Sequence, residues 1–391
     1  MRILFLHEVG YLEKPIFEMH EFPEHLAARG HEVAFADYSE TPSHQTAPRF
    51  GAVIQGRVLS GASLRLYSQK AVFPGIIGRL LAVFLFPFFF HRVLSDFKPN
   101  VVVSFAVPTS GWQAAIICRM HRRPLLFRAL DVSHKIRRSM FASLVKVAER
   151  FVYSNASWVS CNNPALLGYC ISLGAKEGKS SVDYPPLDLS HFLEGASKKI
   201  VRSKLGIPQE SQVILYMGSF FYFSGLADVL RNLALMGERP TLVLIGGGEQ
   251  DAELRAMTEN LHLENSVKFT GFVEFGDLPA YLSIADVAIN PMVPSLVSNK
   301  ALPNKVLQYM ASGLPVVTTK LDGLSSIFEE QGGIESVADS TMVLSAAVAM
   351  LENPELEKLG EVNRGAVARK FDVKHAVQSF EQRLLTLGLD S

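Results

Sequence analysis

Three consecutive glycines stand where an apolar strand gives way to a helix. Gly246, Gly247 and Gly248 follow the strand pattern 241–245, and a helical pattern begins at Asp251. Glycine adopts positive φ and lets a ligand approach the main chain closely. The N-terminus of the helix behind such a turn offers unpaired N–H groups and a positive dipole end, which suit phosphate. The run therefore indicates either a phosphate-binding turn or a tight strand-to-helix turn without a ligand.

Two side chains that can exchange protons follow an earlier strand. Asp131 and His134 come after the strand pattern 125–128. Ligands of open parallel sheets bind beyond the carboxyl ends of the strands, so we expect both residues at a ligand site as an acid, a base or an orienting group. Capping of a helix N-terminus is the alternative role for Asp131.

Three further residues lie near predicted strand ends. Arg128 is a candidate for orienting phosphate, because its guanidinium forms paired hydrogen bonds with phosphate oxygens. His7 and Glu8 follow the first strand, and a buried structural role is the alternative for His7. The N-terminal residues predict this buried strand and not a signal peptide.

The composition is that of a globular protein with two domains. A chain of 391 residues is longer than one hydrophobic core usually supports. The 38 Lys and Arg balance the 38 Asp and Glu, which gives no electrostatic reason for a nucleic-acid partner. Three cysteines without CxxC spacing argue against a disulfide scaffold or zinc site and favour a cytoplasmic location. The HExxH, GxxxxGK[ST] and GxSxG motifs are absent, so we predict no metal and no cofactor.

One apolar segment bears on membrane contact. Residues 71–90 carry a single charge, Arg79, and end in an aromatic run. A spanning helix needs ~20 apolar residues, and interruptions such as Pro87 predict that this one is too short. It is either a buried core helix or an apolar surface that lies on the inner face of a membrane. The basic clusters 119–123 and 135–138 would then meet anionic lipid, or they are solvated helix faces.

Strand and helix patterns alternate twice along the chain. Short apolar strands between amphipathic helices fill residues 1–190, and the same alternation restarts over 200–370. The stretch 184–199 between them contains two prolines and two lysines and is typical of a linker. This order predicts an α/β protein of two doubly wound, Rossmann-like domains with ligands bound in a cleft.

The second half resembles the nucleotide-sugar-binding domain of the family four glycosyltransferases, which have the GT-B architecture. Five motifs stand in the order and spacing of that family, at 215–218, 244–249, 267–273, 278–287 and 303–317. The first half is more divergent, and 26–33 and 186–192 are similar to motifs of the family's acceptor-side domain. By resemblance, the helix over 371–391 crosses back to the N-terminal domain.

The resemblance implies transfer of a sugar, with retention, from a nucleotide diphosphate sugar to a glycan or lipid-linked acceptor. It implies no cofactor, because the nucleotide sugar is a substrate. Two alternatives stay open. One is a nucleotide-sugar epimerase of the same fold, and the other is a homologue with a degenerate donor site that serves as a binding or scaffold subunit.

The resemblance also assigns roles to residues. We predict Asp131, His134 and Lys305 as catalytic: the first two as an acid, a base or an orienting group after their strand, and Lys305 as a cation that stabilises the departing diphosphate. The predicted donor-binding residues are Gly10, Gly218, Ser219, Ser224, Gly246, Gly247, Gly248, Lys300, Lys305 and Gln308.

Four of these positions depart from the family. Ser219 and Ser224 stand where the family often has an Arg and a Lys, and Lys300 and Gln308 stand where it has two glutamates. Glutamine in place of the second glutamate replaces a charge-assisted hydrogen bond to the ribose, worth ~1.5–3 kcal/mol, by a neutral one of about 1 kcal/mol. We expect weaker donor binding, which Lys300 and Lys305 would partly offset.

Overall fold

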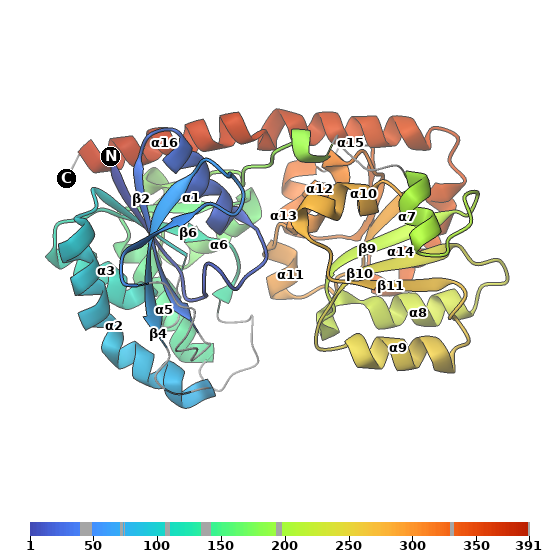
Figure 1. The fold of residues 1–391 in the computed structure, drawn as a ribbon, viewed down its shortest axis with the longest axis horizontal. Coiled ribbons are helices and arrows are strands. Elements are labelled where there is room, and N and C mark those ends of the chain that lie inside the picture. Colours follow the sequence, from blue (N-terminus) through green and yellow to red (C-terminus); the bar gives the residue numbers. More distant parts are fainter. Residues whose placement is uncertain are drawn as a thin grey trace. The chain divides into compact units, whose positions relative to one another are not determined.

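The computed structural model describes residues 1–39, 49–70, 73, 75–105, 110–133, 142–192, 198–328 and 332–389. Two compact units make up the chain (Figure 1). The first comprises Met1–Pro186 and Lys374–Ser391, and the second comprises Leu187–Val373.

The first unit is built on an eight-stranded sheet. Its strands are β1 (Arg2–Leu6), β2 (Glu32–Ser39), β3 (Ala52–Gln55), β4 (Ser63–Lys70), β5 (Val101–Ser104), β6 (Leu125–Ala129), β7 (Trp158–Cys161) and β8 (Ser180–Val182). They lie in the order β3-β4-β2-β1-β5-β6-β7-β8, and all neighbours are parallel except the β3–β4 pair. The chain order reverses between β1 and β5, and a doubly wound sheet opens a crevice at such a point.

Helices pack on this sheet through apolar side chains. They are α1 (Glu18–Ala28), α2 (Gly75–Phe97), α3 (Gly111–Met120), α5 (Ala142–Asn155), α6 (Pro164–Ser172) and α16 (Val373–Leu389), with a short 3-10 helix, η1 (Glu177–Lys179). One core joins α2 and α3 to β1, β2 and β5. Helix α16 packs on α1, where the rings of Phe380 and Phe22 lie 4.3 Å apart. Glu381 of α16 pairs with Arg29 and His31.

Helix α2 is continuous through Pro87, so the predicted interruption there is wrong. Proline has no N–H to donate to the carbonyl four residues earlier, which belongs to Val83. Gln113 of α3 supplies the missing donor, with Nε2 3.0 Å from the Val83 carbonyl oxygen. By length and composition, Ile77–Phe97 is apolar enough to cross a membrane. Its inner side nevertheless belongs to the core through Phe86, Phe90 and Val93.

The second unit has a fully parallel, six-stranded sheet. Its strands are β9 (Val213–Ser219), β10 (Thr241–Gly247), β11 (Val267–Gly271), β12 (Val287–Asn290), β13 (Val316–Thr319) and β14 (Ile334–Val337). Their order, β11-β10-β9-β12-β13-β14, is that of a Rossmann sheet. Ligands of such sheets bind where the order reverses, here beyond the carboxyl ends of β9 and β12. The predicted fold class of two doubly wound α/β domains is confirmed.

Short loops connect these strands to helices, which include the amphipathic α8 and α12. The helices are α7 (Lys198–Lys204), α8 (Leu226–Ala234), α9 (Asp251–Asn260), α10 (Leu278–Leu282), α11 (Leu296–Lys300), α12 (Asn304–Ala311), α13 (Asp322–Phe328), α14 (Ser340–Leu351) and α15 (Leu356–Phe371). Three 3-10 helices accompany them: η2 (Ser190–Phe192), η3 (Tyr222–Ser224) and η4 (Phe275–Asp277). One core joins α8 and α14 to β9, β10 and β12, and it fixes the carboxyl ends of these strands.

Candidate functional site

The glycine run lies at the carboxyl end of β10, against the end of β9. Gly246 pairs with Gly218 across the two strands, and both have positive φ, 123° and 137°. A Cβ on Gly246 would lie 2.1 Å from the Gly218 carbonyl oxygen, and one on Gly248 would lie 2.9 Å from the Phe220 nitrogen. Close packing of the two main chains therefore requires glycine at both positions. This corner is a tight turn whether or not a ligand binds to it.

Lys305 reaches the same corner from α12. Its Nζ donates a hydrogen bond to the Tyr216 hydroxyl at 2.9 Å and lies 4.2 Å from the centre of that ring. A Cβ on Gly218 would lie 2.9 Å from the same Nζ. Gly218 is thus in contact with the glycine run on one side and with Lys305 on the other. The ammonium is held against bare main chain at the point where the strand order reverses.

Two tyrosines that we did not single out from the sequence position this lysine. The Tyr216 hydroxyl donates to the Ser219 carbonyl oxygen at 3.0 Å, which ties the lysine's partner to the end of β9. One helical turn after Lys305, the Tyr309 hydroxyl accepts a hydrogen bond of 2.6 Å from the Met217 amide. Tyr309 lies inside the 303–317 motif, so its position was the available signal.

The other predicted donor residues of this unit are in different surroundings. Lys300 forms an ion pair of 2.7 Å with Asp322, which occupies its charge. Gln308 is half-buried three residues after Lys305, so the two share a face of α12. Ser219 is exposed, whereas Ser224 is 2% exposed and its hydroxyl has no hydrogen-bond partner among the described residues. Ser219 is therefore accessible to a ligand and Ser224 is not.

Asp131 lies just beyond the carboxyl end of β6 and is half-buried. Burial, and secondly the negative charge of Glu18, raise its pKa to about 6. Its carboxyl group can therefore hold a proton near neutral pH, as an acid or base must. His134 and the basic cluster 135–138 lie outside the described residues. Gly10 lies in the loop after β1, where a Cβ would be 2.8 Å from the Glu13 carboxyl carbon.

Arg128 is not a phosphate ligand, so its predicted role is wrong. The side chain is fully buried. Its Nε donates to Glu18 at 2.9 Å, and Nη2 donates to the same carboxylate oxygen. Its Nη1 donates to the Ser160 hydroxyl at 2.9 Å and to the Asp183 carbonyl oxygen at 2.7 Å. The guanidinium thus joins α1 to β6, β7 and the end of β8, and no face of it is open to a ligand.

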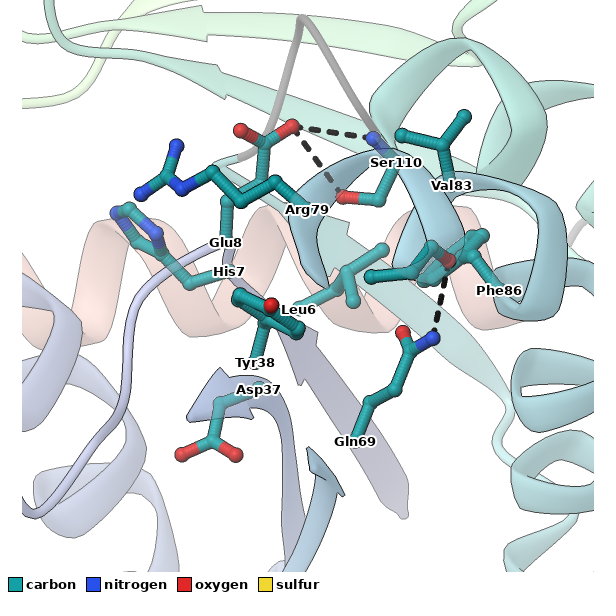
Figure 2. Close-up of a pocket in the computed structure, with 11 residues that line it drawn as sticks. Leu6, His7, Glu8, Asp37, Tyr38, Gln69, Arg79, Val83, Phe86 and Ser110 are labelled. Carbon is teal, nitrogen blue, oxygen red and sulfur yellow. Dashed lines mark hydrogen bonds between the residues drawn. The ribbon is translucent and has the colours of Figure 1, made fainter. Parts of the chain in front are cut away.

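A polar pocket lies where the strand order of the first unit reverses (Figure 2). Its enclosed cavity is small, about 30 Å³, and it opens into a hollow of about 420 Å³ that is continuous with solvent. Residues after β1, the ends of β2 and β4, and the start of α2 and α3 line it. Its polar side chains are His7, Glu8, Asp37, Tyr38, Gln69, Arg79 and Ser110.

Hydrogen bonds hold several of these side chains in place. The Ser110 amide and hydroxyl donate to Glu8 at 3.0 and 3.4 Å, and Gln69 Nε2 donates to the Ala82 carbonyl oxygen at 2.9 Å, as Figure 2 shows. Asp37 is 4% exposed and accepts a hydrogen bond of 2.7 Å from the Tyr11 amide. Its second oxygen has no partner among the described residues.

Burial sets the charges of two groups in this pocket. It raises the pKa of Asp37 to about 6, against smaller lowerings by the neighbouring Ser68 hydroxyl and by the Tyr11 amide. It lowers the pKa of His7 to about 3, helped by electrostatic repulsion from the neighbouring His20 and Lys14, so the imidazole is neutral at physiological pH. His7 stacks on Phe105 with 5.5 Å between ring centres, and its Nδ1 has no partner among the described residues.

Comparison with known families decides the identity. Residues 19–191 match the family described as Glycosyltransferase Family 4, and residues 211–353 match Glycosyl transferases group 1. The chain belongs to the family 4 glycosyltransferases. Members of this family are enzymes that transfer sugars, so this glycosyltransferase is one as well.

Relatives of this glycosyltransferase carry related names. LpsD of Rhizobium meliloti, a lipopolysaccharide core biosynthesis glycosyltransferase, is 22% identical over 81% of this chain and 84% of its own. N-acetyl-alpha-D-glucosaminyl L-malate synthase of Bacillus anthracis is 25% identical, over 46% of this chain and 47% of its own. This chain thus spans about half the length of that relative.

Solved structures of low sequence identity share the fold of this glycosyltransferase. Sucrose-phosphate synthase from Thermosynechococcus elongatus superposes with a TM-score of 0.79 over the full length of both chains, at 20% identity. HepE from Anabaena in complex with UDP-glucose superposes with a TM-score of 0.74, at 20% identity, over 99% of this chain and 100% of its own. These likenesses confirm the GT-B fold.

Proposed function

We propose that this glycosyltransferase transfers a hexose, with retention, from a nucleotide diphosphate sugar that binds at the carboxyl end of β9. The observation that carries the proposal is the ammonium of Lys305, held beside the bare main chain of Gly218. A fixed cation and main-chain amides are the groups that stabilise a departing diphosphate. The similar structure of HepE with UDP-glucose supports a nucleotide sugar as the donor.

The substituted positions define how the donor would be held. Ser219 offers an exposed hydroxyl where the family often has a cation, and Gln308 offers an amide on the same helix face as Lys305. Both are neutral, so Lys305 is the charged group of this corner that faces the main chain of β9. We infer that binding of the donor diphosphate depends strongly on Lys305. In relatives that also have the Arg and Lys replaced here by Ser219 and Ser224, three cations would share this role.

Calorimetric titration with nucleotides tests the donor proposal. We expect UDP or GDP to bind with a dissociation constant in the micromolar to millimolar range, as is usual for enzyme substrates. AMP serves as the control ligand, because it lacks the diphosphate. A folded protein that binds no nucleoside diphosphate would overturn the proposal and favour the scaffold alternative.

We propose that the open hollow at the mouth of the polar pocket binds the acceptor, a glycan or a lipid-linked sugar at the inner face of the membrane. Sugar hydroxyls donate to carboxylates and accept from amide and guanidinium N–H groups. The pocket offers both kinds of partner, and the buried Asp37 beside it has one carboxylate oxygen without a hydrogen-bond partner among the described residues. It lies where the strand order reverses, the usual ligand position in such sheets.

The variant Asp37→Asn tests this pocket. Asparagine keeps an oxygen for the Tyr11 amide but replaces the second oxygen by an NH₂ group. We expect the KM for the acceptor to rise by about tenfold or more, because a buried polar group is left mismatched, while the affinity for the donor stays unchanged. An unchanged acceptor KM would remove Asp37 from the site.

A stability measurement separates this effect from misfolding. The pKa of Asp37 is higher in the folded state than its ordinary value of 3.8. The folded wild-type protein therefore loses stability as pH rises from about 4 to 6 and this carboxyl group ionises. Asparagine carries no such charge. The variant should therefore unfold at an equal or higher temperature than wild type at pH 7, and a lower temperature would point to a packing defect.

A further inference from the structure

Helix α2 has two different sides. Its inner side packs on the sheet, and Arg79, Val83 and Phe86 line the polar pocket. Its outer side carries an unpartnered apolar stripe at helical spacing, made by Ile77, Leu80, Phe84 and Phe88. Phe84 is 73% exposed and Phe88 is 77% exposed. Large side chains that are exposed in a row on one helix face mark a contact surface.

The two neighbouring helices extend this apolar surface. Helix α3 contacts α2 on one side and α5 on the other (Figure 1). Each carries exposed apolar residues three or four positions apart: Trp112, Ile116 and Met120 on α3, and Leu144, Val147 and Phe151 on α5. We call the exposed stripes of α2, α3 and α5 the apolar face. Because α3 contacts both α2 and α5, these three exposed stripes lie on neighbouring helices, and water solvates such apolar side chains poorly.

The charged residues on the three helices that carry the apolar face are mainly cationic. Arg92 of α2, Arg119 of α3, and Lys146 and Arg150 of α5 are exposed. Only two acidic residues, Asp96 and Glu149, lie within the described parts of the three helices. Asp96 accepts a hydrogen bond of 2.6 Å from Tyr67, and Glu149 is buried.

A basic pocket adjoins the end of the α3 stripe. Met120, the last apolar residue of that stripe, is next to Arg119, which lines the pocket together with Arg122, Arg123, Lys179 and Arg383. Five cations around one hollow attract a phosphate group. Arg383 already shares its charge with Asp183 at 3.2 Å.

We propose that the apolar face lies in the surface of an anionic lipid bilayer, with the basic pocket taking a phosphate headgroup. Apolar burial together with cations is the combination that binds an amphipathic surface to anionic lipid. Helix α2 lies on the bilayer and does not cross it, because Phe86, Phe90 and Val93 are committed to the core of the first unit. Membrane binding itself does not depend on the proposed function. Only the suggestion that the acceptor is linked to a lipid rests on it.

The position of α2 gives this docking a consequence for the acceptor. The same helix contacts the bilayer with its outer side and the polar pocket with its inner side. Arg79 of the pocket lies between Ile77 and Leu80 of the stripe in sequence. A sugar on a lipid carrier would therefore have a path of about one helix diameter, roughly 10 Å, from the headgroup layer to the pocket.

Vesicle flotation of the full-length protein tests the proposal. The probe is a vesicle of phosphatidylglycerol and phosphatidylcholine in equal amounts, with pure phosphatidylcholine as the neutral comparison. We expect wild type to float with the anionic vesicles and the double variant Phe84→Ser/Phe88→Ser to lose binding by at least about tenfold. Arg119→Ser/Arg122→Ser should lose binding to anionic vesicles and make the remainder insensitive to salt.

Matched controls keep each outcome informative. Leu235→Ser changes a side chain of the second unit that is 85% exposed and should float like wild type. Nucleotide affinity should be equal in all variants, which separates this test from that of the donor site. Wild type that stays in solution with anionic vesicles would overturn the proposal. So would a dimer, seen by light scattering, that Phe84→Ser/Phe88→Ser dissociates, because the apolar face would then bind a second copy.

Discussion

Replacement of Lys305 by alanine is expected to lower the turnover of sugar transfer by about 10²–10³, the usual loss when one group that stabilises a developing negative charge is removed. The lysine is held by Tyr216 through a hydrogen bond of 2.9 Å and through the face of its ring. The other lysine predicted for this site, Lys300, is paired with Asp322. The measurement is kcat with the nucleotide sugar that calorimetry selects, starting from UDP-glucose.

The chain offers a closely matched control for this prediction. Lys204 of α7 also donates to a tyrosine hydroxyl, that of Tyr281, at 3.1 Å, and lies 5.6 Å from the centre of its ring. Lys204→Ala removes the same kind of pair away from the end of β9 and should leave kcat within about twofold of wild type. Equal turnover of Lys305→Ala and wild type would place the leaving group elsewhere.

The fold was predictable because it depends on local patterns. Short apolar strands, helices between them and glycines at strand ends predicted two doubly wound sheets, and the alternation located β9 to β13 but not β14. Helix α2 was not predicted correctly. Its continuity through Pro87 depends on Gln113, a residue of another helix, and no local pattern contains that contact.

The candidate site was predictable only in part, for the same reason. Lys305 and the glycines lie in motifs of local sequence, and the structure brings them together around Gly218. Asp37, Gln69 and Arg79 come from three separate elements, so their meeting in one pocket depends on strand order. Asp37 follows the apolar part of β2, as Asp131 follows β6, and this position was the signal that could have identified it.

Arg128 was misassigned because sequence shows only its place at a strand end. Guanidinium groups bind carboxylates as readily as phosphates, and α1 brings Glu18 to it from 110 residues earlier. Of the ion pairs described in the first unit, Arg128–Glu18 is the most deeply buried. Ser160 and Asp183 accept further hydrogen bonds from the guanidinium. Its role is therefore in stability, which leads to a different prediction.

Replacement of Arg128 by methionine is expected to lower the free energy of unfolding of the first unit by about 3–5 kcal/mol, because Glu18 is left as an uncompensated buried charge. Burial already raises the pKa of Glu18 above its ordinary value of 4.5, against the lowering by Arg128. Without the guanidinium the pKa rises further. A group with a raised pKa in the folded state loses stability as pH increases, so the deficit should grow between pH 5 and 8.

Tryptophan fluorescence during urea unfolding measures this loss selectively, because both tryptophans, Trp112 and Trp158, belong to the first unit. Arg2→Met removes an exposed ion pair with Glu32 in the same unit and should cost less than about 1 kcal/mol. The double variant Glu18→Leu/Arg128→Met removes both charges and should recover most of the loss, since a buried ion pair contributes little against apolar packing. If the double variant is as unstable as Arg128→Met, the cost arises from lost packing and from the hydrogen bonds to Ser160 and Asp183, and not from the stranded charge of Glu18.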